Sequence, residues 1–398
     1  MSHPLNVNRR SFITLLGLGA GATALSTTLT GCGSLETQLD YGWNGPSPDE
    51  KDMRLKVLAY AMLCPNPHNK QPWLIEFTGP HTLDLYVDPT RLLPATDPFY
   101  RQIHIGQGTF LETLAIAATH FGYRADIQYF PQGMYSNTQL QDKPVASIHL
   151  IKDKQVQTDP MFAYLLQRQS NKREYNNEAL SEQHKSSMQA FHAENSLSKL
   201  TLVDSSQAKQ KLEKVLTQAM EIEVGNKARD EETIKMFRFN QQEIEQFRDG
   251  FGVAQSGVSG LKKVLIENII LSRESVEKDP TAFGEQAVEM TQKSAASTAT
   301  FGWMTTQGNS RLDQVKVGRE YCRMNLKSTA LGLAQHPMSQ VLQEYEGMQA
   351  LQKDFKKFFN IKKTDTVQML FRLGVAQAVA HGPRRTVQSL FKANTKKA

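Results

Sequence analysis

The first 32 residues constrain the rest of the chain most strongly, because they have the form of a signal that exports proteins already folded. Residues 8–14 (NRRSFIT) match a twin-arginine motif, and a weakly hydrophobic stretch rich in Gly and Ala follows over residues 15–29. Residues 29–32 (LTGC) have the form of a lipoprotein cleavage box in which Cys32 receives the lipid. Proteins on the twin-arginine route often carry a cofactor that is loaded before export. The signal therefore favours a chain that folds around a cofactor.

We expect the mature chain to start at Cys32 and to lie in the periplasm, held to the cell envelope by its lipid, with the twin-arginine translocon as a partner. A transmembrane anchor is the alternative. The stretch 15–29 is rich in Gly and Thr, however, and falls short of the roughly 20 strongly apolar residues of a membrane span. Gly17, Gly19 and Gly21 imitate a nucleotide-binding glycine cluster, but no strand precedes them and the segment is removed.

The composition is that of a globular chain with one large domain or two ordinary ones. A formal net charge of +6 is mild over 398 residues, and no block of Lys and Arg alternates with aromatic residues. We therefore expect no nucleic-acid partner. The sequence contains neither an HExxH nor a CxxC motif, so we expect no metal site. Cys64 and Cys322 stand isolated and are expected to be free and buried, a disulfide being the alternative in an oxidising compartment.

Hydrophobic periodicity and turn residues divide the chain into helices and strands. Residues 181–297 have the pattern of long polar helices, interrupted by Gly250-Phe251-Gly252. Elsewhere the patterns predict helices over 50–62, 108–121 and 318–332 and strands over 74–78, 83–87, 145–151, 299–305 and 366–374. The expected organisation is a signal (1–31), a tether (32–48), a first half (49–155) and a second half (156–398) with a helical insertion at about 195–295.

Two of the predicted helices share a spacing. Residues 108–122 and 318–332 each run from one glycine to another, and residues 119–123 (THFGY) have the pattern of residues 329–333 (TALGL). Because glycine commonly ends helices, this repeat alone leaves open whether the chain is internally duplicated.

Four short segments concentrate cations, carboxamides and imidazoles. The first is the proline-rich loop 65–73 (PNPHNKQPW), whose prolines stiffen a loop that carries polar side chains. An ordinary turn, in which Trp73 covers the core, would explain the same residues. The candidate binding residues of this loop are Asn66, Pro67, His68, Asn69 and Gln71.

The other three segments follow in the second half. Residues 168–175 (RQSNKREY) offer three cations and small polar groups, although a solvated charge run has the same composition. Residues 334–340 (AQHPMSQ) follow a predicted helix end and could present backbone N–H groups, or be a plain loop. Residues 382–385 (GPRR) form a paired-arginine turn or a basic surface. The candidate binding residues here are Arg168, Gln169, Ser170, Lys172, Pro337, Met338, Ser339, Gln340, Arg384 and Arg385.

These groups match the needs of flavin mononucleotide (FMN). Its phosphate is best held by guanidinium and ammonium groups. The polar edge of its ring takes amide donors and acceptors, its N5 takes a hydrogen-bond donor, and a cation near N1 stabilises the reduced ring.

Together the segments resemble the nitroreductase superfamily and, within it, the duplicated branch called the Acg family of FMN-binding oxidoreductases. Asn69-x-Gln71-Pro72-Trp73 is similar to the flavin-edge loop of the superfamily, and Arg168-x-Ser170-x-Lys172 to its Arg-x-Ser-x-Lys/Arg motif. Stretches similar to those that mark the Acg branch are residues 88–98 (DPTRLLPATDP), 368–374 (QMLFRLG) and 383–385 (PRR).

The resemblance covers residues 50–390 apart from 195–295. It implies an α+β fold in which helices flank a central mixed sheet, with two pseudo-symmetric halves in one chain. These halves would share the FMN that ordinary members hold between two chains. Residues 66–71 would then meet the ring, Pro67 and His68 standing where the family tends to have small hydroxyl residues. Arg168, Ser170 and Lys172 would hold the ribityl chain, the phosphate and the N1/O2 side, residues 337–340 would lie near N5, and Arg384 and Arg385 near the phosphate.

The resemblance implies an exported FMN-dependent oxidoreductase that passes hydride or electrons through flavin N5 to a nitro compound, a quinone or a similar small acceptor. No side chain is expected to act as the main acid or base. Because NAD(P)H is scarce outside the cytoplasm, we expect a quinol or a periplasmic protein as electron donor. Two alternatives stay open: a lipoprotein that binds or sequesters FMN without turnover, and a structural lipoprotein with a degenerate pocket.

Overall fold

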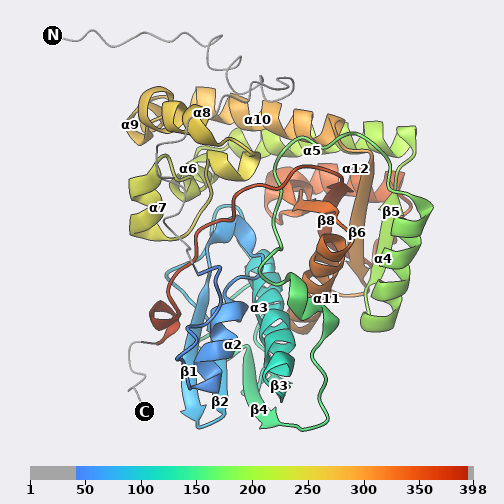
Figure 1. The fold of residues 1–398 in the computed structure, drawn as a ribbon. Helices are drawn as coiled ribbons and strands as arrows, with labels where there is room; N and C mark the ends of the chain where they lie inside the picture. The colour runs from blue at the N-terminus through green and yellow to red at the C-terminus, as the bar shows by residue number, and fades with distance from the viewer. Residues whose placement is uncertain (1–41, 393–398) are drawn as a thin grey trace, which may run out of the picture.

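The computed structural model describes residues 42–392, so the signal and Cys32 lie outside the described residues. Two β-sheets and the helices around them make up an α+β fold, as predicted (Figure 1). The strands are β1 (Trp73–Gly79), β2 (Thr82–Val87), β3 (Tyr123–Tyr129), β4 (Ala146–Lys152), β5 (Lys199–Val203), β6 (Thr300–Thr306), β7 (Ala334–Pro337) and β8 (Thr366–Gly374). The α-helices are α2 (Met53–Ala61), α3 (Arg101–His120), α4 (Glu182–Asn195), α5 (Ser206–Val224), α6 (Lys227–Met236), α7 (Gln241–Phe247), α8 (Gly260–Leu265), α9 (Arg273–Lys278), α10 (Thr281–Ala296), α11 (Arg311–Ala330) and α12 (Gln349–Phe358). Within residues 42–392, no helix has both the length and the hydropathy for crossing a bilayer.

The two sheets have the same topology. The first is four-stranded in the order β1-β2-β4-β3 and the second in the order β5-β6-β8-β7. In each, two strands precede a 20-residue helix, α3 or α11, and two strands follow it. All the ladders between these strands are antiparallel, so the expected single mixed sheet is instead a pair of antiparallel sheets. A parallel bridge between Ile75 and Phe391 adds to the outer edge of β1.

Helices α3 and α11 cross in the middle of the molecule, at their glycines. A Cβ on Gly108 would lie 1.9 Å from the Val315 carbonyl oxygen, and a Cβ on Gly318 would lie 2.1 Å from that of Ile105. Only glycine allows two backbones to approach so closely. Both helices begin seven residues before the glycines that mark their expected starts. The first turn of α3 is stabilised by Asp97, which accepts from the backbone of Ile103 (2.9 Å).

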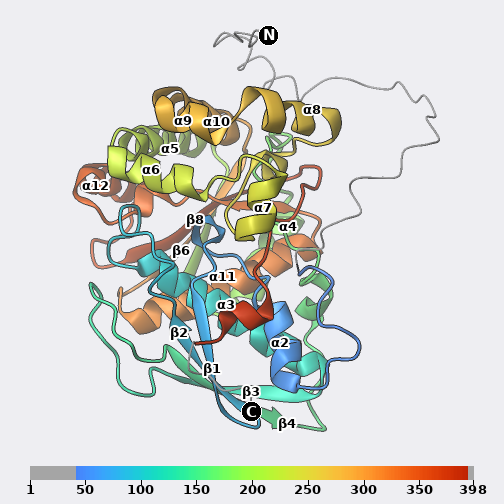
Figure 2. The ribbon, with the colours of Figure 1, turned by 90° about the vertical axis from the view of Figure 1, so that its left-hand side faces the viewer.

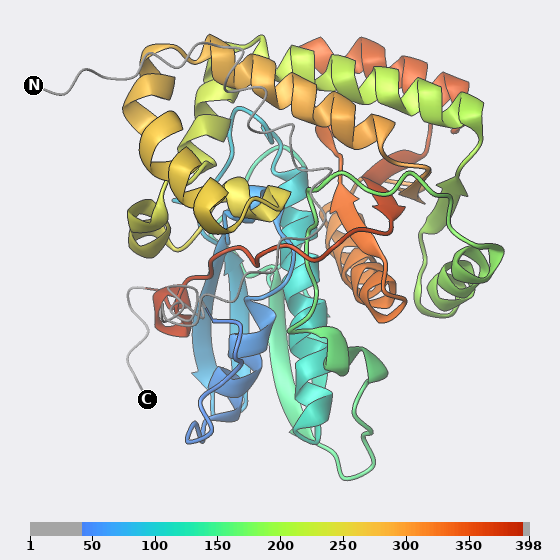
Figure 3. The same ribbon diagram turned by 45° about the horizontal axis from the view of Figure 1, so that its top comes forward.

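Helices α5 to α10 lie between β5 and β6 in the chain, in the region of the expected insertion. Helices α5 and α10 pack side by side in a layer that covers one end of the two-sheet core (Figures 1 and 3). The predicted insertion at 195–295 was wrong in one respect: residues 199–203 (KLTLV) form strand β5, which pairs with β6. Strands β3 and β7 were not predicted. Strand β3 (YRADIQY) alternates between intermediate and exposed residues and has no strongly apolar face, and β7 has four residues and ends in a proline.

The C-terminal segment returns from the second sheet to the first (Figures 1 and 2). The Lys392 backbone N–H donates to the Ile75 carbonyl (3.1 Å), and the Phe391 ring lies 4.9 Å from that of Phe77. On its way from β8 to β1 this segment passes the junction of the two halves, where Gly382 and Arg384 line a cavity.

Candidate functional site

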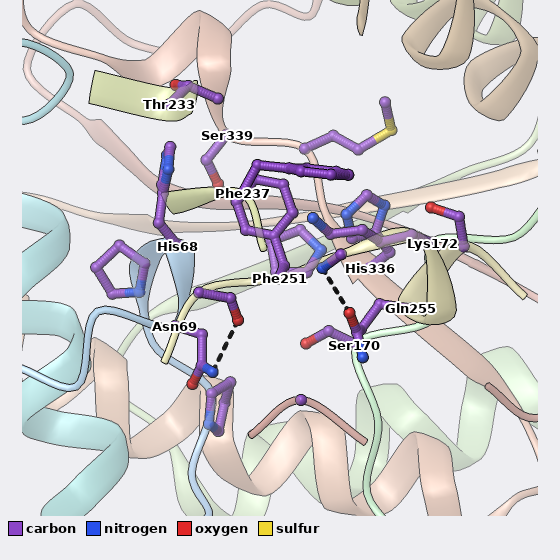
Figure 4. A pocket seen from close by; sticks show the side chains of 18 of the residues that line it. His68, Asn69, Ser170, Lys172, Thr233, Phe237, Phe251, Gln255, His336 and Ser339 are labelled. Carbon is purple, nitrogen blue, oxygen red and sulfur yellow. Dashed lines mark hydrogen bonds between the residues drawn. The ribbon is translucent and has the colours of Figure 1, made fainter. Parts of the chain in front are cut away.

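A cavity of about 390 Å³ lies where the two halves and the insertion meet (Figure 4). All four segments singled out in the sequence contribute to its wall. The predicted site residues that line it are Asn66, Pro67, His68, Asn69, Arg168, Gln169, Ser170, Lys172, Pro337, Met338, Ser339, Gln340 and Arg384. Gln71 and Arg385 lie behind the wall. The fold therefore brings together residues that are up to about three hundred positions apart in the chain.

The proline-rich loop adopts an unusual backbone conformation. His68, Asn69 and Gln71 all have positive φ angles, of 50°, 52° and 53°. Such angles cost energy in non-glycine residues and persist where surrounding contacts enforce them, often at functional sites. Here the Gln71 backbone N–H donates to Asn66 Oδ1 (2.8 Å). Helix α3 packs closely against the loop at Gly106, where an added Cβ would lie only 3.2 Å from Pro67.

The carboxamides of this loop bind protein. Asn69 Nδ2 donates to the carbonyls of Gly250 (2.9 Å) and Pro383 (2.8 Å), and its Oδ1 accepts from Arg384 (2.6 Å). Gln71 is fully buried, and its Oε1 accepts from the Arg385 backbone N–H (2.8 Å). These hydrogen bonds join the loop to the insertion and to the C-terminal segment, while Asn69 also lines the cavity. Contact of these amides with a ligand stays a prediction.

Two arginines occupy one end of the cavity. Arg168 and Arg384 are each 4% exposed, and both donate to the carbonyl of Leu63, at 2.7 and 3.1 Å. Their guanidinium groups also lie near the Trp43 ring, 5.6 and 4.9 Å from its centroid. Burial, together with the neighbouring Arg168, lowers the pKa of Arg384 to about 9. Across residues 42–392, neither arginine has a carboxylate within 4.0 Å, so this end of the cavity carries an excess of positive charge.

A third cation, Lys172, lies further along the wall. Its Nζ is 3.6 Å from the centre of the Phe251 ring, and burial lowers its pKa to about 8. Burial also lowers the pKa of His68 to about 4, with Lys172 adding to the effect. Burial lowers the pKa of His336 as well, again with help from nearby cations. Both imidazoles are therefore neutral at physiological pH, and each can donate one hydrogen bond and accept another.

Several polar atoms of the wall have no partner among the described residues. They are His68 Nδ1, Ser339 Oγ, His381 Nε2 and Arg384 Nε, all buried. A buried polar group left unpaired costs about 1–3 kcal/mol, so these atoms mark the places where a ligand would supply the missing hydrogen bonds.

The remaining candidates shape the second-half side of the cavity. Gln169 Oε1 accepts from the Val379 backbone (2.9 Å), so this side chain anchors the C-terminal segment. The Met338 backbone N–H donates to Leu370 (2.8 Å) at the end of β7, which leaves Ser339 and Gln340 in the following turn on the wall. Cys64 and Cys322 are free and buried, as predicted.

Sequence reasoning missed the residues that the insertion contributes. Phe251 lies against Lys172 and begins an aromatic cluster. The Phe251 and Phe237 ring centroids are 5.8 Å apart, and those of Phe237 and Phe283 are 5.2 Å apart. The one available signal was Gly250-Phe251-Gly252, noted only as a helix interruption. Gly250 has a φ of +72°, and a Cβ there would lie 2.1 Å from the Met236 carbonyl oxygen.

No protein-family model matches the sequence. It is 41% identical over 83 residues to uncharacterized protein Rv3127 of Mycobacterium tuberculosis, and 33% identical over 84 residues to the same organism's "Putative NAD(P)H nitroreductase Rv3131". These matches cover 20% and 21% of this chain, and 24% of each relative. The chain thus spans about a quarter of the length of these curated relatives.

Similar solved structures are nitroreductases. One from Anabaena variabilis, called a putative nitroreductase, has 11% identity and a TM-score of 0.39, covering 79% of this chain and 82% of its own. A Bacteroides fragilis nitroreductase with bound FMN has 12% identity and a TM-score of 0.34, covering 61% and 99%. The FMN-dependent nitroreductase NfnB of Mycobacterium smegmatis, solved with NADPH, has 12% identity and a TM-score of 0.33, covering 57% and 94%.

Proposed function

We propose that this chain is an FMN-dependent oxidoreductase of the nitroreductase type. The observation that carries the proposal is the trio of cations on one cavity wall, Arg168, Arg384 and Lys172, for which the described chain provides no anionic partner. An isolated buried charge is costly, and charges in protein interiors are normally paired. A ligand with a dianionic phosphate, and a ring that becomes anionic on reduction, would neutralise this wall.

The residues present fit FMN. The two arginines sit where a phosphate could take charge-assisted hydrogen bonds from two guanidinium groups, and the unpartnered Arg384 Nε would supply one of them. Lys172 would place a cation beside the ring, where it favours the reduced, anionic form. Ser339 Oγ and His68 Nδ1 are free to bond with its polar atoms. When bound, the flavin supplies hydride and electron transfer at N5, and the chain supplies orientation and electrostatics.

We further propose that the two halves arose by internal duplication. The supporting observations are the identical strand orders and the equal lengths of α3 and α11, with Gly108 and Gly318 in contact at their crossing. Each half supplies one side of the cavity. A single chain would then form the site that two chains form in ordinary members of the family.

Export, the electron donor and the acceptor also belong to the proposal. The twin-arginine motif at residues 8–14 and the lipid box at Cys32 favour a periplasmic, lipid-anchored protein. A lipid anchor would hold the site near the membrane, where quinols are concentrated, and a nitro compound or quinone would be the acceptor.

The test is flavin retention by the full-length protein purified from the cell envelope. Arg168→Ala and Arg384→Ala are each expected to lower FMN affinity about tenfold to a hundredfold, because each removes charge-assisted hydrogen bonds worth about 1.5–3 kcal/mol. Exposed Lys154→Ala serves as the matched control. If both arginine variants retain flavin after dialysis as fully as the wild type, the phosphate assignment is wrong.

A second function, FMN sequestration without turnover, is favoured by one observation. The insertion covers the cavity: Phe251 packs on Lys172, and the Gly250 backbone N–H donates to Asn69 (3.2 Å) within the flavin-edge loop. The two functions differ in the reoxidation of photoreduced protein. An enzyme is reoxidised faster when quinone is added than by oxygen alone, whereas a sequestering protein shows no acceleration.

A further inference from the structure

The insertion gives the cavity a second region of different chemistry from the cationic wall. Most of its lining is apolar, and α5, α6 and α10 supply it together with the turn after α8. Two carboxyl groups, Glu223 and Asp230, interrupt this apolar surface. The apolar lining residues include Met220, Val224, Ile266, Leu271, Phe283 and Met290.

Glu223 is held in the wall without a full set of partners. Its side chain is 2% exposed, and Oε1 accepts from Thr233 Oγ1 (3.4 Å), a residue that also lines the cavity. Its Oε2 is buried with no hydrogen-bond partner, and no cation pairs with it within residues 42–392. Burial raises the pKa of Glu223 to about 7, although the nearby Gln343, Thr233 and Arg229 act in the opposite direction. A buried carboxyl oxygen without a hydrogen-bond partner lowers the stability of the folded protein, as do the unpaired donors of the cationic wall.

Asp230, in the first turn of α6, is a second carboxyl group in this region. It is 8% exposed and lines the same cavity, and burial, with Glu231 contributing, raises its pKa to about 6. Arg168, Lys172 and Arg384 belong to other segments of the wall and form no ion pair with either carboxyl group. The cavity therefore has cations without a carboxylate partner on one part of its wall and two carboxyl groups on another, with Glu223 Oε2 lacking a hydrogen-bond partner.

We propose that the region walled by the insertion is a substrate site for an apolar molecule, ring-bearing or long-chained, that presents an N–H or O–H donor to Glu223 and Asp230. This inference rests on the proposed function, because it assigns the cationic wall to the cofactor and the acidic region to the molecule that reacts with it. The donor group supplies the bond that Glu223 Oε2 lacks, and the apolar body lies against Val224, Phe283 and Met290. Hydroquinones and alkylamines with an apolar body share this chemistry.

Three naphthalene probes test the proposal by calorimetric titration of the full-length, FMN-loaded protein. They are 2-naphthol, which carries a neutral O–H donor, 2-naphthylmethylamine, which carries a cationic N–H donor, and 2-methoxynaphthalene, which has no donor. The titrations are run at pH 8, above the pKa of Glu223, so that its carboxylate is mostly ionised. We expect at least one of the two donor probes to bind about tenfold or more tightly than the ether, since hydrogen bonds to charged groups are the stronger ones. A preference for the naphthol indicates a hydroxyl substrate such as a hydroquinone, and a preference for the amine indicates a cationic substrate.

Variants assign the preference to the carboxyl group. Glu223→Leu keeps the side-chain size and is expected to abolish the preference for donor probes, and Asp230→Asn to reduce it. Glu221 lies two residues before Glu223, on the exposed side of α5. Glu221→Leu is the matched control and is expected to leave the binding of all three probes unchanged. Equal binding of all three probes, no binding of any, or an unchanged preference in Glu223→Leu would overturn the inference.

The flavin spectrum separates this inference from the proposed function. Protein that is purified yellow but shows no preference for donors retains the proposed function and contradicts the substrate site. Protein that is purified colourless and cannot be loaded with FMN contradicts the proposed function, whatever the apoprotein does with the probes.

Discussion

Lys172→Met is expected to stabilise the apoprotein and to weaken FMN binding at the same time. Burial lowers the pKa of Lys172 from 10.5 to about 8, so in the folded apoprotein the charged amine is disfavoured relative to the unfolded chain. The corresponding penalty is at most about 3 kcal/mol, from about 1.4 kcal/mol per pKa unit. The contact of Nζ with the Phe251 ring at 3.6 Å offsets about 0.5–2 kcal/mol of it. The apo variant should therefore be more stable than the wild type by about 1–2 kcal/mol at pH 7.

The sign of the pH dependence follows from the same shift. A base whose pKa is lowered by folding destabilises the protein fully below its folded pKa, and this penalty disappears as the pH rises past its unfolded pKa. Wild-type apoprotein should gain stability between about pH 8 and pH 10.5 relative to Lys172→Met. Urea unfolding of both apoproteins across this window measures the difference, and exposed Lys154→Met is the control.

The holoprotein should respond in the opposite direction. Removal of the cation beside the ring is expected to raise the Kd for FMN about tenfold or more, measured by quenching of flavin fluorescence. A variant that is less stable than the wild type as apoprotein, or that binds FMN equally well, would refute the reasoning that Lys172 is a cation desolvated by the fold and used to bind the flavin.

Three further predictions follow from the packing and the charges. Gly318→Ala should lower stability by about 1–3 kcal/mol or more, since its Cβ would lie 2.1 Å from a carbonyl oxygen, whereas Gly347→Ala, with its nearest neighbour at 3.5 Å, should be nearly neutral in thermal unfolding. Glu223→Gln should stabilise the apoprotein at pH 8 by up to about 3 kcal/mol but should not stabilise it at pH 4. The reason is that the raised pKa of Glu223 costs folding free energy as the pH rises from 4.5 through about 7. Equal differences in the free energy of unfolding at both pH values would count against the burial of Glu223. Asn69→Ala should loosen the insertion, because its side chain joins three segments, and faster proteolysis near Gly250 would show this.

The sequence predicted much of the fold because most elements have strong local patterns. The strand at 366–374 coincides with β8, and the pairing of 74–78 with 83–87 is the hairpin of β1 and β2. Strand β5 escaped because the long polar helices around it dominate the composition of the region. The division into two sheets could not be predicted, because it depends on pairings between strands far apart in the sequence, such as β5 with β6. Local periodicity carries no information about such pairings.

The candidate site was predictable where one residue type performs one task. Cations such as Arg168 and Lys172 stand out in a sequence, and the structure places both on the cavity wall. The carboxamides could not be assigned in the same way, because an amide binds a backbone as readily as a ligand, and Gln71 turned inward to Arg385. The aromatic and acidic residues of the insertion have no motif at all. Only the fold shows that Phe251 and Glu223 reach the cavity.

The central claim is that a phosphate-bearing flavin neutralises the buried cations between the two halves. An experimental electron-density map of the protein as purified from the cell envelope tests it most directly. The map should show one FMN in each chain, with its phosphate between Arg168 and Arg384 and its ring toward Lys172. A cavity filled only by water, with the two guanidinium groups in the same place and nothing bound between them, would contradict the account.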